Sequence, residues 1–216
     1  MSARVRHAFA ESAAVLATVV ERDAALIERM ARLVASTVRR GRTVFFVGNG
    51  GSAAEAQHLA TELVVRFVRN RGPIAAAALT TDTSVLTATG NDMGFDQIFA
   101  RSVSALGRRG DLLVALTTSG RSRNILTAVA AARARGMRVM GMTGALGRAF
   151  ARRCDLCLVV PSRVTARIQE VHLLAGHLCC EAAEEVALRR TKRAKRAKAA
   201  NAARSATPTK RKKRRA

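Results

Sequence analysis

The chain has 216 residues, 49% of them hydrophobic, which predicts a single domain with a buried core. Its formal net charge of +23 is typical of nucleic-acid binders, but seven Phe and no Trp or Tyr argue against a base-stacking surface. No apolar run approaches the roughly 18–20 residues that cross a bilayer, so we expect no membrane partner.

The first predicted unit is a helix followed by a strand and a second helix. Apolar residues recur at helical spacing from Val5 to Arg40, and Gly41 is a typical helix end. A β-rich run, Thr43–Val47, then leads into the turn Gly48–Gly51. Ser52 and Glu55 have the spacing of a capping box, which predicts that a helix begins there.

The same strand, turn and helix arrangement recurs in the second half. The run Leu112–Leu116 precedes the polar turn Thr117–Ser122, and a predicted helix over 123–135 ends at Gly136. Three further apolar runs complete about five short strands, at 74–79, 139–142 and 156–160. This alternation predicts an α/β fold, with a doubly wound and mostly parallel sheet flanked by helices.

A last amphipathic helix is expected from about Thr165 to Ala187, and the composition changes after it. From Arg189 to Ala216 there are 14 Lys or Arg and no acid, whereas the preceding residues hold 24 basic against 15 acidic side chains. We therefore expect three parts: an N-terminal helical segment (1–41), a ligand-binding domain (42–190) and a disordered basic tail (191–216).

Both polar turns are candidate anion sites. In doubly wound sheets ligands bind beyond the carboxyl ends of the strands, and helix N-termini offer free amide donors. The glycines of the first turn permit close backbone approach, and the second turn adds the hydroxyls of Thr118, Ser119 and Ser122. Neither a Walker motif nor GxGxxG is present, which disfavours a nucleotide.

Histidine and acidic side chains near these turns are candidates for proton transfer. His58 and Glu62 are four residues apart and share a helix face, as either an acid–base pair or a surface contact. On the last helix Gln169 and His177 are eight residues apart, ~12 Å along the axis. His172 lies 140° around that helix from His177 at 100° per residue, and we expect it to be structural.

Two other polar groups carry weaker signals. Asn91-Asp92 follows Gly90 and is typical of a cap or turn. Cys154 and Cys157 form a CxxC pattern without a second pair or a nearby His, so packing is favoured over zinc or redox chemistry. Four cysteines without a signal-peptide pattern indicate a reducing cytoplasm.

Taken together, these motifs resemble the sugar isomerase (SIS) domain family, and within it the phosphoheptose isomerase group. The resemblance covers nearly everything before the tail. It is carried by the segments 48–58 with Glu62, Leu79–Ser84, Gly90–Asp92, Thr117–Ser122 and Thr165–His172 with His177.

The resemblance implies an aldose–ketose isomerase that converts sedoheptulose 7-phosphate into D-glycero-D-manno-heptose 7-phosphate for lipopolysaccharide synthesis. In this role Glu62 is the expected base and His177 the expected acid. The implied zinc ligands are His58, Glu62, Gln169 and His177. A homotetramer is also implied. The implied substrate contacts are Asn49, Gly50, Gly51, Ser52, Glu62, Asn91, Asp92, Thr117, Thr118, Ser119, Ser122 and Gln169.

A non-catalytic relative that binds the bacterial replication initiator shares both turns and the segment 166–170, so a scaffold is the alternative function. His177 favours the enzyme, because an acid at that position has no evident purpose in a scaffold. The basic tail belongs to neither function. Its charge predicts salt-sensitive, nonspecific affinity for DNA or RNA.

Overall fold

The computed structural model describes residues 2–205, and side chains are described as far as Lys192. Five strands form one sheet in the order β2-β1-β3-β4-β5, and all neighbouring strands pair in parallel. This confirms the predicted doubly wound α/β fold. The strands are β1 (Val44–Val47), β2 (Ala76–Ala78), β3 (Leu112–Thr117), β4 (Arg138–Gly144) and β5 (Leu156–Val160).

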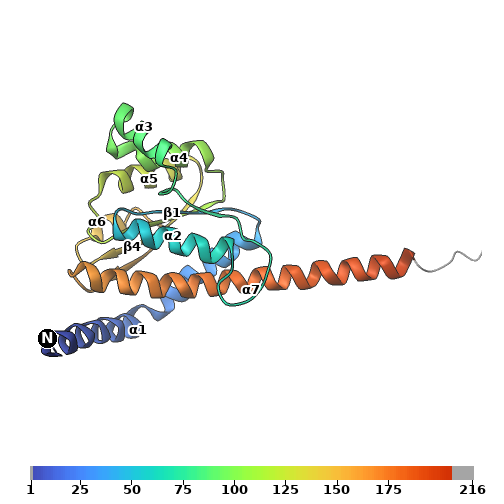
Figure 1. Ribbon diagram of the computed structural model, residues 1–216, viewed down its shortest axis with the longest axis horizontal. Helices are drawn as coiled ribbons and strands as arrows, with labels where there is room; N and C mark the ends of the chain where they lie inside the picture. Colours follow the sequence, from blue (N-terminus) through green and yellow to red (C-terminus); the bar gives the residue numbers. More distant parts are fainter. Residues whose placement is uncertain (1, 206–216) are drawn as a thin grey trace, which may run out of the picture.

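Helices cover both faces of this sheet, as Figure 1 shows. On one face lie α1 (Ser2–Arg39), α2 (Gly51–Val64) and α7 (Thr165–Ser205). On the other lie α4 (Ile98–Leu106), α5 (Arg123–Ala134) and the short α6 (Arg148–Ala151). Helix α3 (Thr83–Met93) and the 3-10 turn η1 (Phe95–Gln97) connect β2 to α4.

The core divides into two apolar clusters because successive strand residues point to opposite faces. In β1, Val44 and Phe46 pack with α1, α2 and α7, whereas Phe45 and Val47 pack with α4 and α5. All four are buried, as expected for a parallel sheet covered on both sides. The packing fixes the carboxyl ends of the strands, where the polar turns emerge.

The first and last helices lie side by side and run in the same direction. Ser12 Oγ donates to Glu170 Oε2 (2.6 Å), and farther along Arg190 Nη1 donates to the Val38 carbonyl (3.1 Å). Both helices contribute to one apolar cluster. Within residues 2–205, no helix has the length and apolar character needed to span a membrane.

Two local expectations were wrong. Helix α7 continues to Ser205 rather than ending near Ala187. Residues 191–205 are mostly Ala, Lys and Arg, which favour helices, and contain no Gly or Pro. Residues 206–216 of the expected tail lie outside the described residues. The capping box is also absent, because α2 begins at Gly51 with Gly50 as its N-cap and no side chain caps it.

Candidate active site

The two polar turns meet where the strand order reverses. In the sheet β1 lies between β2 and β3. The chain runs from β1 to β2 on one side, and then continues to β3 on the other side of β1. This is the topological switch point at which doubly wound sheets bind ligands. Asn49, after β1, and Asn124, in α5, join the two turns by two hydrogen bonds of 3.0 and 2.7 Å.

A polar cavity of about 140 Å³ lies between these turns. The starts of α2 and α5 both face it, so backbone amides and the positive ends of two helix dipoles point at the same space. Ser122 is the N-cap of α5 but makes no capping hydrogen bond with its side chain, which leaves its hydroxyl for a ligand. The cavity is lined by Asn49, Gly51, Ser52, Leu116, Thr117, Thr118, Ser122, Thr165 and Gln169.

Most of the predicted phosphate contacts therefore come together. Ser119 is not among the lining residues, and its hydroxyl accepts the Arg121 amide at 3.2 Å. Gly50, with φ of 53°, occupies a backbone region that favours glycine. A side chain at Gly51 would collide with the amide of Gln169, so this glycine allows α7 to approach the turn.

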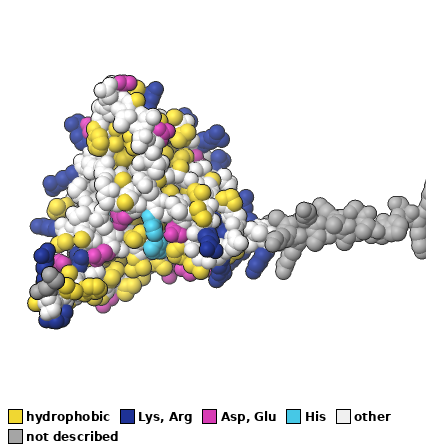
Figure 2. Space-filling view, viewed as in Figure 1, with side chains coloured by type: hydrophobic (Ala, Val, Ile, Leu, Met, Phe, Trp, Pro, Cys, Tyr) yellow, Lys and Arg dark blue, Asp and Glu magenta, His cyan; other side chains and the backbone are white. Residues whose placement is uncertain are grey.

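The predicted proton-transfer residues form a second cluster, farther along α2 and α7. His58 Nε2 lies 2.9 Å from His177 Nε2 and 3.5 Å from Glu62 Oε1. The His58–Glu62 contact was predicted from the helix period, whereas the contact between the two imidazoles joins residues 119 positions apart. Figure 2 shows histidine side chains grouped on this face, with acidic side chains beside them.

The surroundings of His177 favour its neutral form. Partial burial lowers the pKa of His177; a charged His58 would lower it further, and the Glu62 carboxylate opposes both effects. The ring of Phe67 packs against it with centroids 5.5 Å apart. The contact with His58 Nε2 holds the ring of His177 in a defined orientation.

The other histidine of α7 has a different environment. His172 is fully buried, and burial lowers its pKa to about 4. It faces the sheet near Thr143 rather than the His58–His177 cluster. This confirms the structural role expected for His172.

The implied metal site is only partly assembled. Among residues 2–192, no three His, Cys, Asp or Glu side chains are arranged to hold a metal ion. His58, Glu62 and His177 nevertheless offer the nitrogen and oxygen atoms that zinc prefers. His177 Nε2 and Glu62 Oε1 both lie within 3.5 Å of His58 Nε2. Gln169 lies against Gly51 and lines the polar cavity between the turns instead.

Asn91 and Asp92 are not part of the polar cavity. They lie in the last turn of α3, where both are exposed and Asn91 Nδ2 donates to Asp92 Oδ1 (2.8 Å). Asn91 and Asp92 are therefore helical, and do not form the cap or turn expected there. Gly90, just before them, lines a mainly apolar cavity of about 390 Å³ that also borders Asn49 and Gly50.

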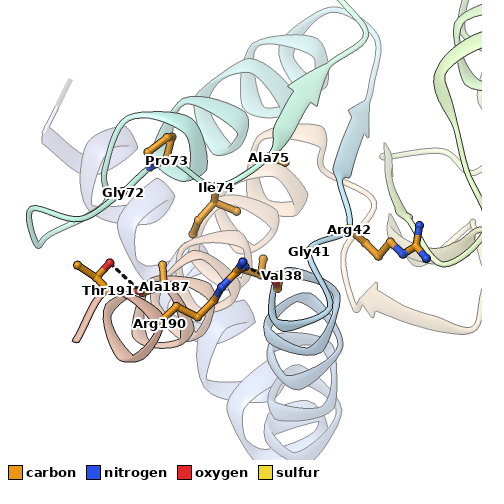
Figure 3. A pocket seen from close by; sticks show the side chains of 10 residues that line it. All are labelled: Val38, Gly41, Arg42, Gly72, Pro73, Ile74, Ala75, Ala187, Arg190 and Thr191. Carbon is orange, nitrogen blue, oxygen red and sulfur yellow. Dashed lines mark hydrogen bonds between the residues drawn. The ribbon is translucent and has the colours of Figure 1, made fainter. Parts of the chain in front are cut away.

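Another cavity, of about 330 Å³, lies at the opposite end of the sheet (Figure 3). Its lining residues precede β1 and β2, or belong to the end of α1 and the middle of α7. In Figure 3 the Arg42 side chain points away from the other labelled residues, whereas Arg190 extends toward Val38, and its Nη1 donates to the Val38 carbonyl. None of the predicted site residues lies there.

The cysteines take no part in either cluster. All four are free, and Cys154 and Cys157 pack against the apolar cluster beneath α5 and α6. This agrees with the packing role favoured from the sequence.

Four polar residues that sequence reasoning did not select also lie near the site. Asn124 links the turns, and Glu55 is a buried carboxyl group on α2 whose pKa is raised by burial to about 7. Arg71 and Glu184 form a buried ion pair beyond Glu62. Asn124, which follows a Ser/Thr turn, and Glu55, at capping-box spacing from Ser52, carried local signals, but neither signal indicated a place near the site.

Comparison with known proteins decides the family. The SIS domain family matches residues 8–144. A phosphoheptose isomerase from Rhodospirillum rubrum is 55% identical over 159 residues, which cover 74% of this chain and 85% of that protein. The chain belongs to the SIS domain family, among the phosphoheptose isomerases.

Further relatives agree in sequence and structure. A phosphoheptose isomerase from Roseiflexus is 51% identical over 165 residues, covering 76% of this chain and 84% of that protein. The solved phosphoheptose isomerase of Neisseria gonorrhoeae has a TM-score of 0.80 and 42% identity, covering 85% and 98% of the two chains. For that of Francisella tularensis the TM-score is 0.81 and the identity 37%, with coverage of 84% and 97%.

Proposed function

We propose that this SIS-family protein isomerises sedoheptulose 7-phosphate to D-glycero-D-manno-heptose 7-phosphate, for lipopolysaccharide heptose synthesis. One observation carries the proposal: Glu62 and His177 meet around His58, farther along the two helices whose first turns line a phosphate-sized polar cavity. His58 lies seven residues after Gly51, ~10 Å along α2. An extended sugar phosphate thus has its phosphate at one end and its reacting carbons at the other.

The phosphate is bound by the turn after β3 and the start of α5. Thr118 and Ser122 donate hydroxyl hydrogen bonds, and the α5 amides add their own. Across the cavity Asn49, Gly51 and Gln169 hold the sugar chain. These contacts do not change during the reaction, so they set substrate affinity and orientation.

The chemistry moves one proton between two adjacent carbons. The Glu62 carboxylate takes the proton from C1 of the open-chain ketose, and the C1–H electron pair forms the enediol double bond. His177 donates a proton to O2, and the enediol is neutral. The proton on Glu62 is then delivered to C2 while His177 recovers a proton from O1, which yields the aldose and restores both residues.

The test is direct turnover of sedoheptulose 7-phosphate by the purified protein, followed by NMR detection of the aldose. Glu62→Gln and His177→Ala are each expected to lower kcat by about 10²–10⁴-fold. Glu181→Gln, an exposed change on α7, is the matched control and keeps wild-type kcat. Absence of turnover by the wild-type protein, with or without added metal, would refute the proposal.

The initiator-binding scaffold is disfavoured by the contact between His58 and His177. A scaffold needs no imidazole pair next to a carboxylate, whereas an isomerase uses both. The relatives described above are also isomerases by name. Tight binding of the replication initiator by a protein without isomerase activity would reverse this preference.

Zinc is a further proposal. His58, Glu62 and His177 would hold the ion, with Gln169 as a fourth donor. A Glu62 carboxylate that binds zinc is not at the same time a free base, so bound zinc would either stabilise the fold or polarise the sugar carbonyl in place of the metal-free proton transfer. Metal content per chain after dialysis, measured by mass spectrometry, tests this independently of activity. His58→Ala is expected to lose the metal, and His7→Ala, an exposed change on α1, to keep it. Equal metal content in both variants would contradict the proposal.

A homotetramer is the assembly we propose. Large apolar side chains remain exposed on three helices of one chain: Val5, Phe9 and Val20 on α1, Val64 on α2, and Leu174 and Leu178 on α7. Faces of this kind are typical of subunit contacts. Light scattering is expected to give four chains per particle, and a monomer at micromolar concentration would exclude the tetramer.

We also propose a cytoplasmic location and a weak affinity of the basic segment for nucleic acid. Four free cysteines agree with a reducing compartment. The 14 basic residues after position 188 supply the charge for binding phosphate backbones.

A further inference from the structure

The loop that follows α2 is tied to α7 by one carboxylate. Glu184 is buried, and its Oε1 accepts the backbone amides of Phe67 (3.1 Å) and Val68 (3.2 Å). Its Oε2 accepts those of Val68 (3.3 Å) and Arg69 (3.1 Å). Three consecutive amides thus converge on one side chain, as in the backbone anion sites known as nests.

The same loop also places a positively charged side chain, that of Arg71, at the end of α2. The Arg71 side chain is fully buried, with Nε 3.6 Å from Glu184 Oε1. Its Nη1 donates to the carbonyl of Leu63 (2.8 Å) and its Nη2 to the carbonyl of Glu62 (2.7 Å). These carbonyls belong to the last turn of α2, where no intrahelical donor is available. Arg71 therefore caps the helix at the residue that acts as the base.

Both anchor points lie next to the proton-transfer residues. Glu184 follows His177 by seven residues, which places it on the same face of α7 two turns farther on. Phe67, held through its amide by Glu184, packs its ring against His177. The chain of contacts runs from the backbone of Glu62 through Arg71 and Glu184 to α7, and through Phe67 to the imidazole.

We propose that Arg71 and Glu184 are positioning residues of the isomerisation, which fix Glu62 on α2 and His177 on α7 at a working separation. The inference rests on the proposed isomerase function. Acid–base groups must lie within hydrogen-bond reach of the atoms they serve, and a displacement of about 1 Å can cost 10²-fold in rate. A buried ion pair that binds the base's own carbonyl restricts that displacement directly.

The chain supplies a matched control on the same helix. Glu185 and Arg189 form an ion pair at the same 3.6 Å separation, but both side chains are largely exposed. Glu184→Gln and Arg71→Lys are expected to lower kcat by about 10–100-fold. KM for sedoheptulose 7-phosphate should change less than about threefold, because the phosphate cavity is untouched. Glu185→Gln and Arg189→Lys should leave both constants unchanged.

A second set of variants separates positioning from fold stability. In the double variant Arg71→Met with Glu184→Gln no buried charge is left unpaired, which removes the main cause of instability. Phe67→Leu leaves the ion pair intact and removes only the ring against His177. Both variants are assayed at a temperature where circular dichroism shows that they are folded. In both, kcat should be lower than in the wild-type protein, while KM should stay close to the wild-type value.

The outcomes distinguish the two proposals. If the wild-type protein turns over substrate and the folded variants keep its kcat while only their unfolding midpoints fall, the pair is structural and the positioning proposal is overturned. If the wild-type protein is inactive, the proposed function fails, and the positioning role fails with it. A selective loss of kcat in folded variants, with normal controls, supports the inference.

Discussion

Asn49 and Asn124 exchange two side-chain hydrogen bonds across 75 residues of sequence, and this contact holds the two ligand-binding turns together. Each amide acts once as donor and once as acceptor in this pair. The Asn124 Oδ1 also accepts the Ile125 amide at 3.0 Å, which ties the contact to the first turn of α5.

Loss of this contact should affect substrate affinity first. Asn124→Ala removes both hydrogen bonds and leaves the Asn49 amide unpaired, so stability should fall by about 1–3 kcal/mol. KM should rise roughly tenfold, since 1.4 kcal/mol of lost binding corresponds to that factor. Steady-state kinetics and urea unfolding provide the measurements, with exposed Asn70→Ala as the control. An unchanged KM would show that the turns keep their relative position without the pair.

The close contact between Gly51 and Gln169 gives a second prediction. Gly51→Ala places a methyl group where the Gln169 amide lies, so that amide must move and the polar cavity that it lines must change shape. KM should rise and kcat should fall together. Gly72→Ala, where the added methyl group meets open space, is the control and should behave as wild type. Wild-type kinetics for Gly51→Ala would mean that Gln169 is free to rotate away.

Glu55 predicts a pH-dependent stability. Burial raises its pKa from 4.5 to about 7, so the native state binds the proton more tightly than the unfolded state. The contribution of Glu55 to the free energy of unfolding is complete below pH 4.5, and it is lost as the pH rises through 7. Glu55→Gln removes this loss, and the variant should be more stable than wild type at pH 8 by up to ~3 kcal/mol. At pH 5 the two should be nearly equal.

Thermal and urea unfolding at both pH values test this expectation. His172 changes stability in the opposite direction between its folded pKa of about 4 and the ordinary 6.5, so only the difference between variant and wild type isolates Glu55. Glu181→Gln, at an exposed position, should show no such difference. A wild-type protein more stable than Glu55→Gln at pH 8 would contradict the buried, protonation-sensitive carboxyl group.

The basic C-terminal segment gives a prediction about nucleic acid. Full-length protein should bind duplex DNA at low salt, and the affinity should fall steeply as salt increases, because counterions are released on binding. Removal of residues 191–216 should abolish this binding and leave isomerase kinetics unchanged. Fluorescence anisotropy with a labelled duplex measures both states. Equal binding by the shortened chain would place the affinity on the folded domain instead.

Local patterns predicted the elements well, because they depend on short-range periodicity. The strands, the helix after each turn and the contact between His58 and Glu62 follow from spacing alone. The pairing of His58 with His177 does not, since it depends on how α2 packs against α7. Asn124, Arg71 and Glu184 were missed for the same reason: their partners lie far away in sequence or on the backbone.

Two errors have different physical causes. Ser52 and Glu55 match the capping-box spacing, but Gly50 adopts a positive φ and begins the helix earlier, so both side chains turn inward. The extension of α7 was missed because charge was weighed more heavily than helix propensity. Lysine, arginine and alanine can continue a helix that has already formed, even where there is little to bury.

The contact between α1 and α7 also has a consequence for biosynthesis. The ribosome makes α1 first, yet the helix that covers its apolar face begins only at Thr165. At a synthesis rate of about 5–20 residues per second, the apolar face of α1 is therefore exposed for many seconds before α7 emerges. The nascent chain should be a client of holding chaperones until translation is almost complete, and stalling before residue 165 should leave α1 accessible to protease.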